Sequence, residues 1–179
     1  MIDRPCRVVL LGMMGSGKTR LGLALAARTG WAYHDNDRLV IEATGRTARE
    51  LLSEGHAELR DAETRALLTG LDMPPPAIIA AAAGVVLDDG ARQAIASRGL
   101  SVWLRAAPQV LAARAIGGAH RPWLDENPAG WMERAAAERA PLYRSVAEHE
   151  VDTGSAGPSE LATEVVAWLR GTACARWLA

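Results

Sequence analysis

A glycine-rich segment, GMMGSGKT at residues 12–19, constrains the fold more than any other feature of the sequence. It fits the pattern GxxxxGK[S/T], in which a strand leads into a loop that closes on the N-terminus of a helix. The flanking residues agree with that context. A Val- and Leu-rich run at 6–11 predicts a buried strand, and apolar residues at helical spacing predict a helix over 18–29. Lys18 is the single lysine of the chain, and it occupies the one position of the pattern where a lysine has a chemical role.

The residue types in this segment suit the binding of nucleotide phosphates. Glycines allow the backbone to curl so that successive N–H groups point at phosphate oxygens, and the helix N-terminus adds the positive end of its dipole. A lysine at position 18 can contact the β- and γ-phosphates, and the Thr19 hydroxyl suits a Mg²⁺ ion. We therefore expect ATP contacts from Gly12, Gly15, Ser16, Gly17, Lys18, Thr19 and Arg20.

Strand-like and helix-like segments alternate along the chain, which is typical of a parallel sheet covered by helices on both faces. No repeat or linker interrupts the alternation, so we expect one domain over residues 1–179. A polar loop at 117–128 is long for such a fold and is a candidate lid. Strands are predicted at 6–11, 31–35, 77–81, 101–105 and 150–152, and helices at 18–29, 37–44, 47–54, 57–70, 89–97, 108–116, from the end of the 117–128 loop to 140, and 158–170.

Composition excludes several classes of function. Lys and Arg number 20 against 21 Asp and Glu, and this balance excludes a broadly basic nucleic-acid surface. Cys6 and Cys174 do not form a dense disulfide framework or a Cys/His cluster, so a zinc site is not indicated and a reducing cytosol is the simplest compartment. The longest apolar stretch, 77–87, is shorter than the roughly 20 residues that span a bilayer. We expect a cytoplasmic monomer that binds neither nucleic acid nor a membrane.

Missing motifs narrow the class of phosphate-loop protein. A regulatory GTPase needs an NKxD motif, and a chain with one lysine, already placed at Lys18, has none. A motor or AAA-type ATPase usually has a Walker B strand that ends in acidic residues. The strand predicted at 77–81 continues to Gly84 without an acidic residue. A compact kinase for a small molecule or a nucleotide remains.

Two carboxylates follow the second predicted strand, at Asp35 and Asp37. If the strand continues, residues two apart point the same way at the carboxyl edge of the sheet, where such folds bind ligands. One carboxylate can then support Mg²⁺ through water while the other accepts a proton from a substrate hydroxyl. The alternative is that Asp37 simply caps the helix that follows. Spacing alone does not separate the two interpretations.

At this point the sequence resembles the shikimate kinase family over nearly its whole length. The phosphate-binding loop and the DxD segment match the family in order and spacing. Each further match is short, and together, in order, they are fairly specific. They are EGHAELRDAE at 54–63 for the family's EGExxFRxxE, RPWL at 121–124 for the lid motif RPLL, RAPLYR at 139–144 for the RxPLYxExA region, and VDT at 151–153 for the closing VDT.

The resemblance implies an α/β fold of three layers, with a five-stranded parallel sheet of the nucleoside-monophosphate-kinase type of phosphate-loop protein. It also implies transfer of the ATP γ-phosphate to the 3-hydroxyl of shikimate, with ATP and Mg²⁺ required and a hydroxy acid as the small-molecule partner. The helical segment at about 37–70 would then bind substrate, and the loop at 117–128 would be the lid.

The same resemblance assigns roles to single residues. Asp37 would bind the acceptor diol and act as the base, Arg60 and Arg139 would hold the substrate carboxylate, and Glu63 would stand nearby. A bidentate guanidinium is the preferred partner of a carboxylate. On the nucleotide side, Asp35 would join Thr19 in supporting Mg²⁺, Arg121 would close over the phosphates as a catalytic lid residue beside Lys18, and Arg114 would lie near the adenine. A solvated surface charge is the alternative for each arginine and is as well supported for Arg114.

The chain departs from the family pattern on the acceptor side. Shikimate kinases carry three glycines after the third strand, where this chain has Ala82, Ala83 and Gly84. We place Ala83 and Gly84 in the substrate site, and the two added methyl groups could intrude on the substrate or forbid the loop geometry. The residues therefore leave open a related kinase for another hydroxy acid or a sugar acid such as gluconate, and a non-catalytic ATP-binding module.

Overall fold

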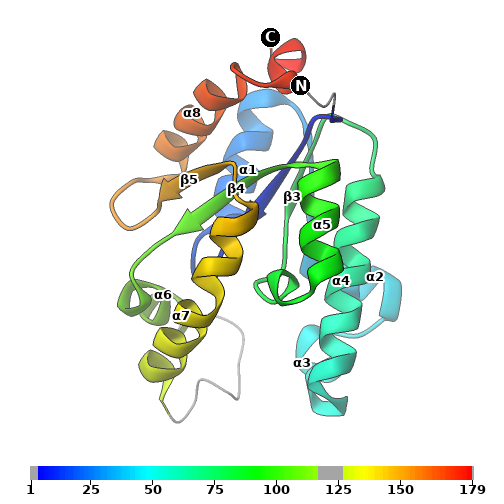
Figure 1. Ribbon diagram of the computed structural model, residues 1–179, viewed down its shortest axis with the longest axis vertical. Coiled ribbons are helices and arrows are strands. Elements are labelled where there is room, and N and C mark those ends of the chain that lie inside the picture. The colour runs from blue at the N-terminus through cyan, green and yellow to red at the C-terminus, as the bar shows by residue number, and fades with distance from the viewer. Residues whose placement is uncertain (1–3, 117–126, 179) are drawn as a thin grey trace.

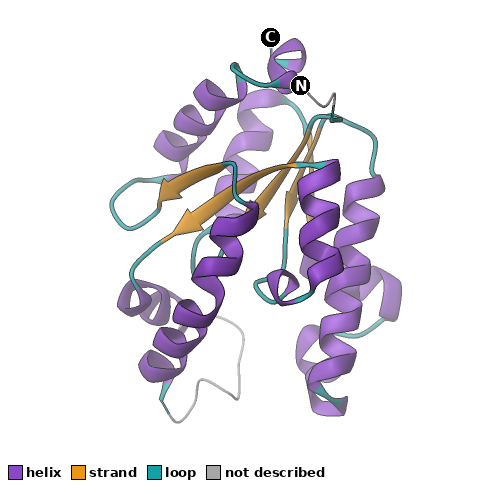
Figure 2. Cartoon of the chain, in the orientation of Figure 1, coloured by secondary structure: helices purple, strands orange, loops and turns teal. Residues whose placement is uncertain are grey.

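The structure, a computed structural model, describes residues 4–116 and 127–178, which form an α/β domain with one parallel sheet (Figures 1 and 2). The five strands of this described part follow the order β2-β3-β1-β4-β5, and all their pairings are parallel. The expected α/β class and five-stranded parallel sheet are confirmed. The strands are β1 (Arg7–Leu11), β2 (Ala32–Asp35), β3 (Ala77–Ala80), β4 (Leu100–Arg105) and β5 (His149–Asp152).

Strand β1 lies in the middle of the sheet, paired with β3 on one side and β4 on the other. Val9 is in register with Ile79 and Ser101. From β1 the chain crosses to the edge strand β2, returns to β3 between β2 and β1, and then adds β4 and β5 on the other side of β1, so the direction of the crossovers reverses between β1 and β3. In open α/β sheets the crevice beyond the carboxyl ends of the strands at such a reversal is where ligands bind.

Alternate side chains of the strands enter two separate cores. Val9 and Leu11 face a core that contains residues of α4, α5 and α7, whereas Val8 and Leu10 face a core that contains residues of α1 and α8. Figure 1 shows α4 and α5 on one side of the sheet and α1 and α8 on the other. The helices are α1 (Lys18–Thr29), α2 (Asn36–Thr44), α3 (Ala48–Glu54), α4 (His56–Asp72), α5 (Asp89–Arg98), α6 (Pro108–Ile116), α7 (Pro128–Val146) and α8 (Pro158–Leu169).

A third apolar cluster joins α2, α3 and α4. Its side chains include Leu39, Leu51 and Leu59, all buried. This cluster fixes the short helices α2 and α3 against the long helix α4, so the segment predicted to bind substrate packs as one unit beside the sheet.

Helix α7 differs from its predicted extent. The sequence analysis predicts an end at Ala140, and the next residue, Pro141, lacks the backbone N–H donor that a helix uses. The helix instead continues through Pro141 to Val146. Tyr143, which is 1% exposed, lies in this added turn and packs against Trp103 of β4 with ring centroids 5.8 Å apart. Burial of this aromatic side chain accounts for the continued helix.

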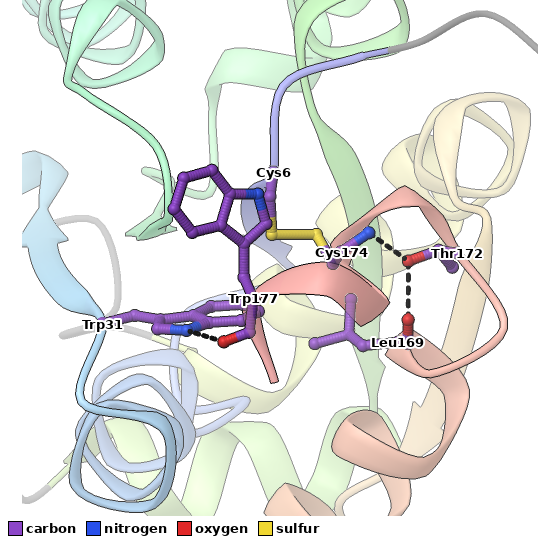
Figure 3. Close-up of a disulfide and its surroundings, with 6 residues drawn as sticks. All are labelled: Cys6, Trp31, Leu169, Thr172, Cys174 and Trp177. Atoms are coloured by element: carbon purple, nitrogen blue, oxygen red, sulfur yellow. Dashed lines mark hydrogen bonds between the residues drawn. A yellow bond between two sulfur atoms is a disulfide. The ribbon is translucent and has the colours of Figure 1, made fainter. Parts of the chain in front are cut away.

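The C-terminal segment, about which the sequence says little, forms a 3₁₀ helix, η3 (Ala173–Trp177). Cys174 in η3 forms a disulfide with Cys6, just before β1, and the Cα atoms are 5.0 Å apart (Figure 3). The Trp31 indole N–H donates to the Trp177 carbonyl, 3.2 Å away. The sequence analysis did not foresee this pairing, which holds the end of the chain against the start of the central strand.

Within the described ranges, none of the helices combines the length and the apolar character that crossing a membrane requires.

Candidate active site

The glycine-rich segment forms a tight loop between β1 and α1. Gly12 has φ 145° and Gly15 has φ 78°, in the left-handed region that side chains disfavour. A Cβ atom on Gly12 would lie 2.6 Å from the Leu104 carbonyl oxygen, and one on Gly15 would lie 2.6 Å from the Leu111 carbonyl oxygen. Both conformation and space therefore require glycine, and the predicted loop is confirmed.

The loop has the features of an anion cradle. Helix α1 begins at Lys18, and Gly17 at its N-cap supplies no side-chain hydrogen bond. Ser16 is fully buried, and its hydroxyl has no hydrogen-bond partner among the described residues. The Lys18 ammonium folds back over the loop and donates to the carbonyls of Gly12 (2.8 Å) and Met13 (3.1 Å). A phosphate group placed here would meet helix N–H groups, a hydroxyl and a cation.

Asp35 ends β2 and caps α2. Its Oδ1 accepts the Asp37 backbone N–H at 3.0 Å, and its Oδ2 accepts the hydroxyls of Tyr33 (2.8 Å) and Thr19 (3.1 Å). The strand therefore stops at Asp35, and Asn36 begins the helix, so the two carboxylates do not alternate along a continuing strand. The capping alternative for Asp37 is also wrong, because Asp35 is the N-cap.

Asp37 lies in the first turn of α2 and lines the same cavity as Asp35. The two carboxylates thus meet at one site, although by a helix turn rather than by strand periodicity. The side chains of Thr19 and Asp35 also present a hydroxyl and a carboxylate oxygen 3.1 Å apart. These hard oxygen donors fit Mg²⁺, which is usually bound by one or two protein groups together with substrate phosphates.

Helix α4 contributes an ion pair to the opposite wall. The Arg60 guanidinium contacts the Glu63 carboxylate. Burial raises the pKa of Glu63 above the usual carboxyl value, and the Arg60 charge opposes that rise. A Cβ atom on Gly84 would overlap both the Arg60 guanidinium and the Glu63 carboxylate. Gly84 has φ −90°, so its role here is to leave space rather than to adopt an unusual conformation.

Helix α7 supplies Arg139, which is 7% exposed. Its Nη1 lies 3.5 Å from the Ala83 carbonyl oxygen, and its guanidinium carbon lies 5.8 Å from the centre of the Trp131 ring. The Arg139 Nε is buried without a hydrogen-bond partner in the described part of the chain. The Tyr143 hydroxyl donates to the Ala83 carbonyl at 2.8 Å and so ties α7 to the segment after β3.

The altered glycine segment does not strain the backbone. Among residues 4–116 and 127–178, every residue with positive φ is a glycine, so Ala82 and Ala83 adopt ordinary conformations. Ala82 is 8% exposed and belongs to the core beneath the sheet edge, and Ala83 is partly exposed at the cavity. The loop geometry therefore accommodates both methyl groups.

These walls enclose a cavity of about 490 Å³ at the carboxyl edge of the sheet. Its volume is typical of a small-molecule site. Most of the predicted site residues that the structure describes line it. They come from the phosphate-binding loop, α1, β2, α2, α4, the segment after β3, α6 and α7. They are Gly15, Ser16, Gly17, Lys18, Thr19, Arg20, Asp35, Asp37, Arg60, Glu63, Ala83, Gly84, Arg114 and Arg139.

For two predicted arginines the proposed role remains untested. Arg114 on α6 lines the cavity at its Thr153 side and donates to the Thr153 carbonyl at 2.8 Å, and its predicted place near the adenine stays a prediction. Arg121 and residues 117–126 of the expected lid lie outside the described residues.

Three aromatic residues near the site were missed by the sequence analysis. Trp131 lines the cavity beside Arg139, the Tyr33 hydroxyl holds Asp35, and the Tyr143 hydroxyl holds Ala83. The chain has only two tyrosines, and each lies within two residues or one helical turn of a predicted site residue. That proximity is the signal that could have identified Tyr33 and Tyr143. Nothing comparable marks Trp131, because it contacts Arg139 across two turns of α7.

Comparison with known proteins agrees with this geometry. A family model described as shikimate kinase matches residues 14–170. A shikimate kinase of Aromatoleum aromaticum is 38% identical over 160 residues, covering 88% of this chain and 91% of the relative. One from Rhodopseudomonas palustris is 35% identical over 175 residues, covering 97% and 84%. The solved structure of the Acinetobacter baumannii shikimate kinase in complex with shikimate superposes with a TM-score of 0.87 at 27% identity, covering 95% of each chain. The fold is thus that of a phosphate-loop kinase of the nucleoside-monophosphate-kinase type, and the chain belongs to the shikimate kinase family.

Proposed function

We propose that the protein transfers the γ-phosphate of ATP to the 3-hydroxyl of shikimate, with Mg²⁺ required. One observation carries the proposal. A phosphate cradle and a pair of arginines suited to a carboxylate face the same cavity of about 490 Å³, with Asp37 also on its wall. An anionic nucleotide tail and an anionic alcohol can therefore occupy one cleft.

The nucleotide half binds and orients the phosphates. The loop N–H groups and Lys18 hold the β- and γ-phosphates, and Ser16 offers its buried hydroxyl. Thr19 and Asp35 would hold Mg²⁺, Asp35 through water. When bound, the ion neutralises charge on the phosphate oxygens. The role of Arg121 as a lid residue over the phosphates stays a prediction, because this residue lies outside the described part of the chain.

The acceptor half positions the alcohol and removes its proton. Arg60 and Arg139 bind the substrate carboxylate through charge-assisted hydrogen bonds. Glu63, paired with Arg60, keeps that guanidinium in place. Asp37 accepts the proton as the hydroxyl oxygen forms a bond to the γ-phosphorus and the bond from phosphorus to the bridging oxygen of ADP breaks.

A coupled assay tests the proposal by measuring ADP release from ATP, Mg²⁺ and folded protein with and without shikimate. We expect turnover that depends on shikimate. Turnover no higher than the ATP-only background rules out shikimate as the acceptor.

A second acceptor class is favoured by Ala83, which places a methyl group in the cavity wall where the family has glycine. The same assay is run with gluconate and other hydroxylated carboxylates. Efficient phosphorylation of shikimate alone excludes this alternative. ATP binding in a calorimeter, with no acceptor turned over, points to a non-catalytic module instead.

A further inference from the structure

The Asp35 carboxylate is held by more donors than capping a helix requires. Its Oδ1 accepts the Asp37 N–H, which completes the cap, while its Oδ2 accepts hydroxyls from Tyr33 at 2.8 Å and Thr19 at 3.1 Å. Three donors from different sites fix the rotation of the carboxylate about its side-chain bonds. The Oδ2 atom, next to Thr19, is the oxygen that the Tyr33 hydroxyl orients.

Tyr33 does not line the cavity itself; it lies behind Asp35. Residues 33 and 35 are two apart on β2, so their side chains leave the same face of the sheet. The Tyr33 ring packs against α1 at Gly22, where a Cβ atom would overlap the ring. Gly22 thus leaves the space that places the hydroxyl on Asp35.

We propose that Tyr33 is a positioning residue, whose hydroxyl holds Asp35 in the orientation that supports the Mg²⁺ bound with the nucleotide. The proposal rests on the function proposed above, but only on its nucleotide half. Side chains that orient metal-supporting groups act through hydrogen bonds of this kind, and their removal typically lowers metal affinity about 10–100-fold.

The Tyr33→Phe variant separates positioning from packing. Phenylalanine keeps the ring against Gly22 and removes only the hydroxyl, so the fold is expected to remain. Without that donor, the Asp35 carboxylate is held only by the Asp37 N–H and the Thr19 hydroxyl, so its orientation is less firmly fixed. Tyr33→Phe should therefore weaken the effect of Mg²⁺ on nucleotide affinity and leave the affinity without Mg²⁺ unchanged.

The experiment is calorimetry of a non-hydrolysable ATP analogue with and without Mg²⁺, with thermal unfolding as a check on folding. We expect Tyr33→Phe to keep the metal-free affinity for the analogue. The factor by which Mg²⁺ raises that affinity, the Mg²⁺-dependent gain, should be about tenfold smaller than in the wild type, at the low end of the range for such partners. Tyr143→Phe is the matched control, because its hydroxyl bonds to Ala83 on the acceptor side. That control should keep the full Mg²⁺-dependent gain.

A double variant tests whether the hydroxyl acts through Asp35. In an Asp35→Asn background, Tyr33→Phe should cause no further loss of the Mg²⁺-dependent gain. Gly22→Ala, which displaces the ring but keeps the hydroxyl, should reproduce the selective loss, and it replaces Tyr33→Phe if that variant does not fold.

Three results overturn the proposal: an undiminished gain in Tyr33→Phe, an undiminished effect of that change in the Asp35→Asn background, or a wild-type affinity that does not respond to Mg²⁺. Failure of the proposed function looks different. In that case wild-type protein shows the Mg²⁺-dependent gain but does not phosphorylate shikimate, and the Tyr33 result still stands on its own.

Discussion

The two halves of the cleft are built in different ways. The nucleotide half comes mainly from the backbone of one contiguous segment, residues 12–19, whose glycines curl it around an anion site. The acceptor half comes from side chains on α2, α4, α7 and the segment after β3. A contiguous backbone site depends on few side chains, whereas a site assembled from separate elements changes whenever one of them is replaced. Two of the departures from the family pattern, Ala82 and Ala83, fall in the acceptor half.

The largest expected effect comes where the nucleotide half does depend on a side chain. Lys18→Ala removes the cation folded over the loop. Loss of one preorganised charge typically costs about 10²–10³ in rate. We expect a fall of that size in kcat at saturating ATP and shikimate, with little change in the unfolding temperature because the loop geometry rests on glycines. Unchanged turnover would refute the role given to Lys18.

A smaller, more selective effect is expected from Arg139→Ala in the acceptor half. A hydrogen bond to a charged group contributes about 1.5–3 kcal/mol, which corresponds to roughly 10–100-fold in affinity. The KM for shikimate should rise by that factor while the affinity for ATP is unchanged. Arg144→Ala on the same helix is the control, since that guanidinium lies over Trp103, 5.5 Å from the ring centre, and outside this cavity. Equal losses for ATP and shikimate would contradict the division into halves.

A third variant tests how tightly the acceptor wall is packed. In Gly84→Ala the new methyl group overlaps the Arg60–Glu63 pair, which must move. Overpacking costs about 1–3 kcal/mol of stability, and a flexible arginine places this case near the lower end. If displacement of Arg60 takes about 1 kcal/mol from shikimate binding, the shikimate KM rises about fivefold. Gly90→Ala is the control, because the nearest atom to its added Cβ is the Asp88 Oδ1, 3.3 Å away and outside the cavity. A KM equal to that of the control means that Arg60 does not bind the acceptor.

The same division explains what the sequence could predict. The loop at 12–19 and the strand and helix around it are local patterns, and the structure has them where predicted. Asp35 and Asp37 do share the site, but the reason given for it was wrong, because capping ends the strand at Asp35. The extension of α7 past Pro141 depends on the burial of Tyr143, and the place of Trp131 depends on how α7 packs. Such contacts join residues far apart in sequence, and local pattern does not encode them.

The smallest expected effect on either half comes from breaking the Cys6–Cys174 disulfide. The disulfide lies before β1 begins, whereas both halves of the cleft lie beyond the carboxyl end of β1. The disulfide and the cleft are therefore separated by about 16 Å of strand. It closes a loop spanning a sequence separation of 168 residues, and removing such a bond typically costs about 2–4 kcal/mol of stability. Addition of a reductant should lower the unfolding temperature and leave kcat and both KM values unchanged.

A Cys6→Ala/Cys174→Ala double variant supplies the control for that measurement. Its unfolding temperature should not respond to reductant, which assigns the wild-type response to this bond. Both sulfur atoms are buried and η3 also bonds to Trp31, so the reduced C-terminal segment keeps packing contacts of its own. If reduction instead lowers turnover of folded protein, the cleft is coupled to the far edge of the sheet, and its two halves cannot be treated as independent of the rest of the fold.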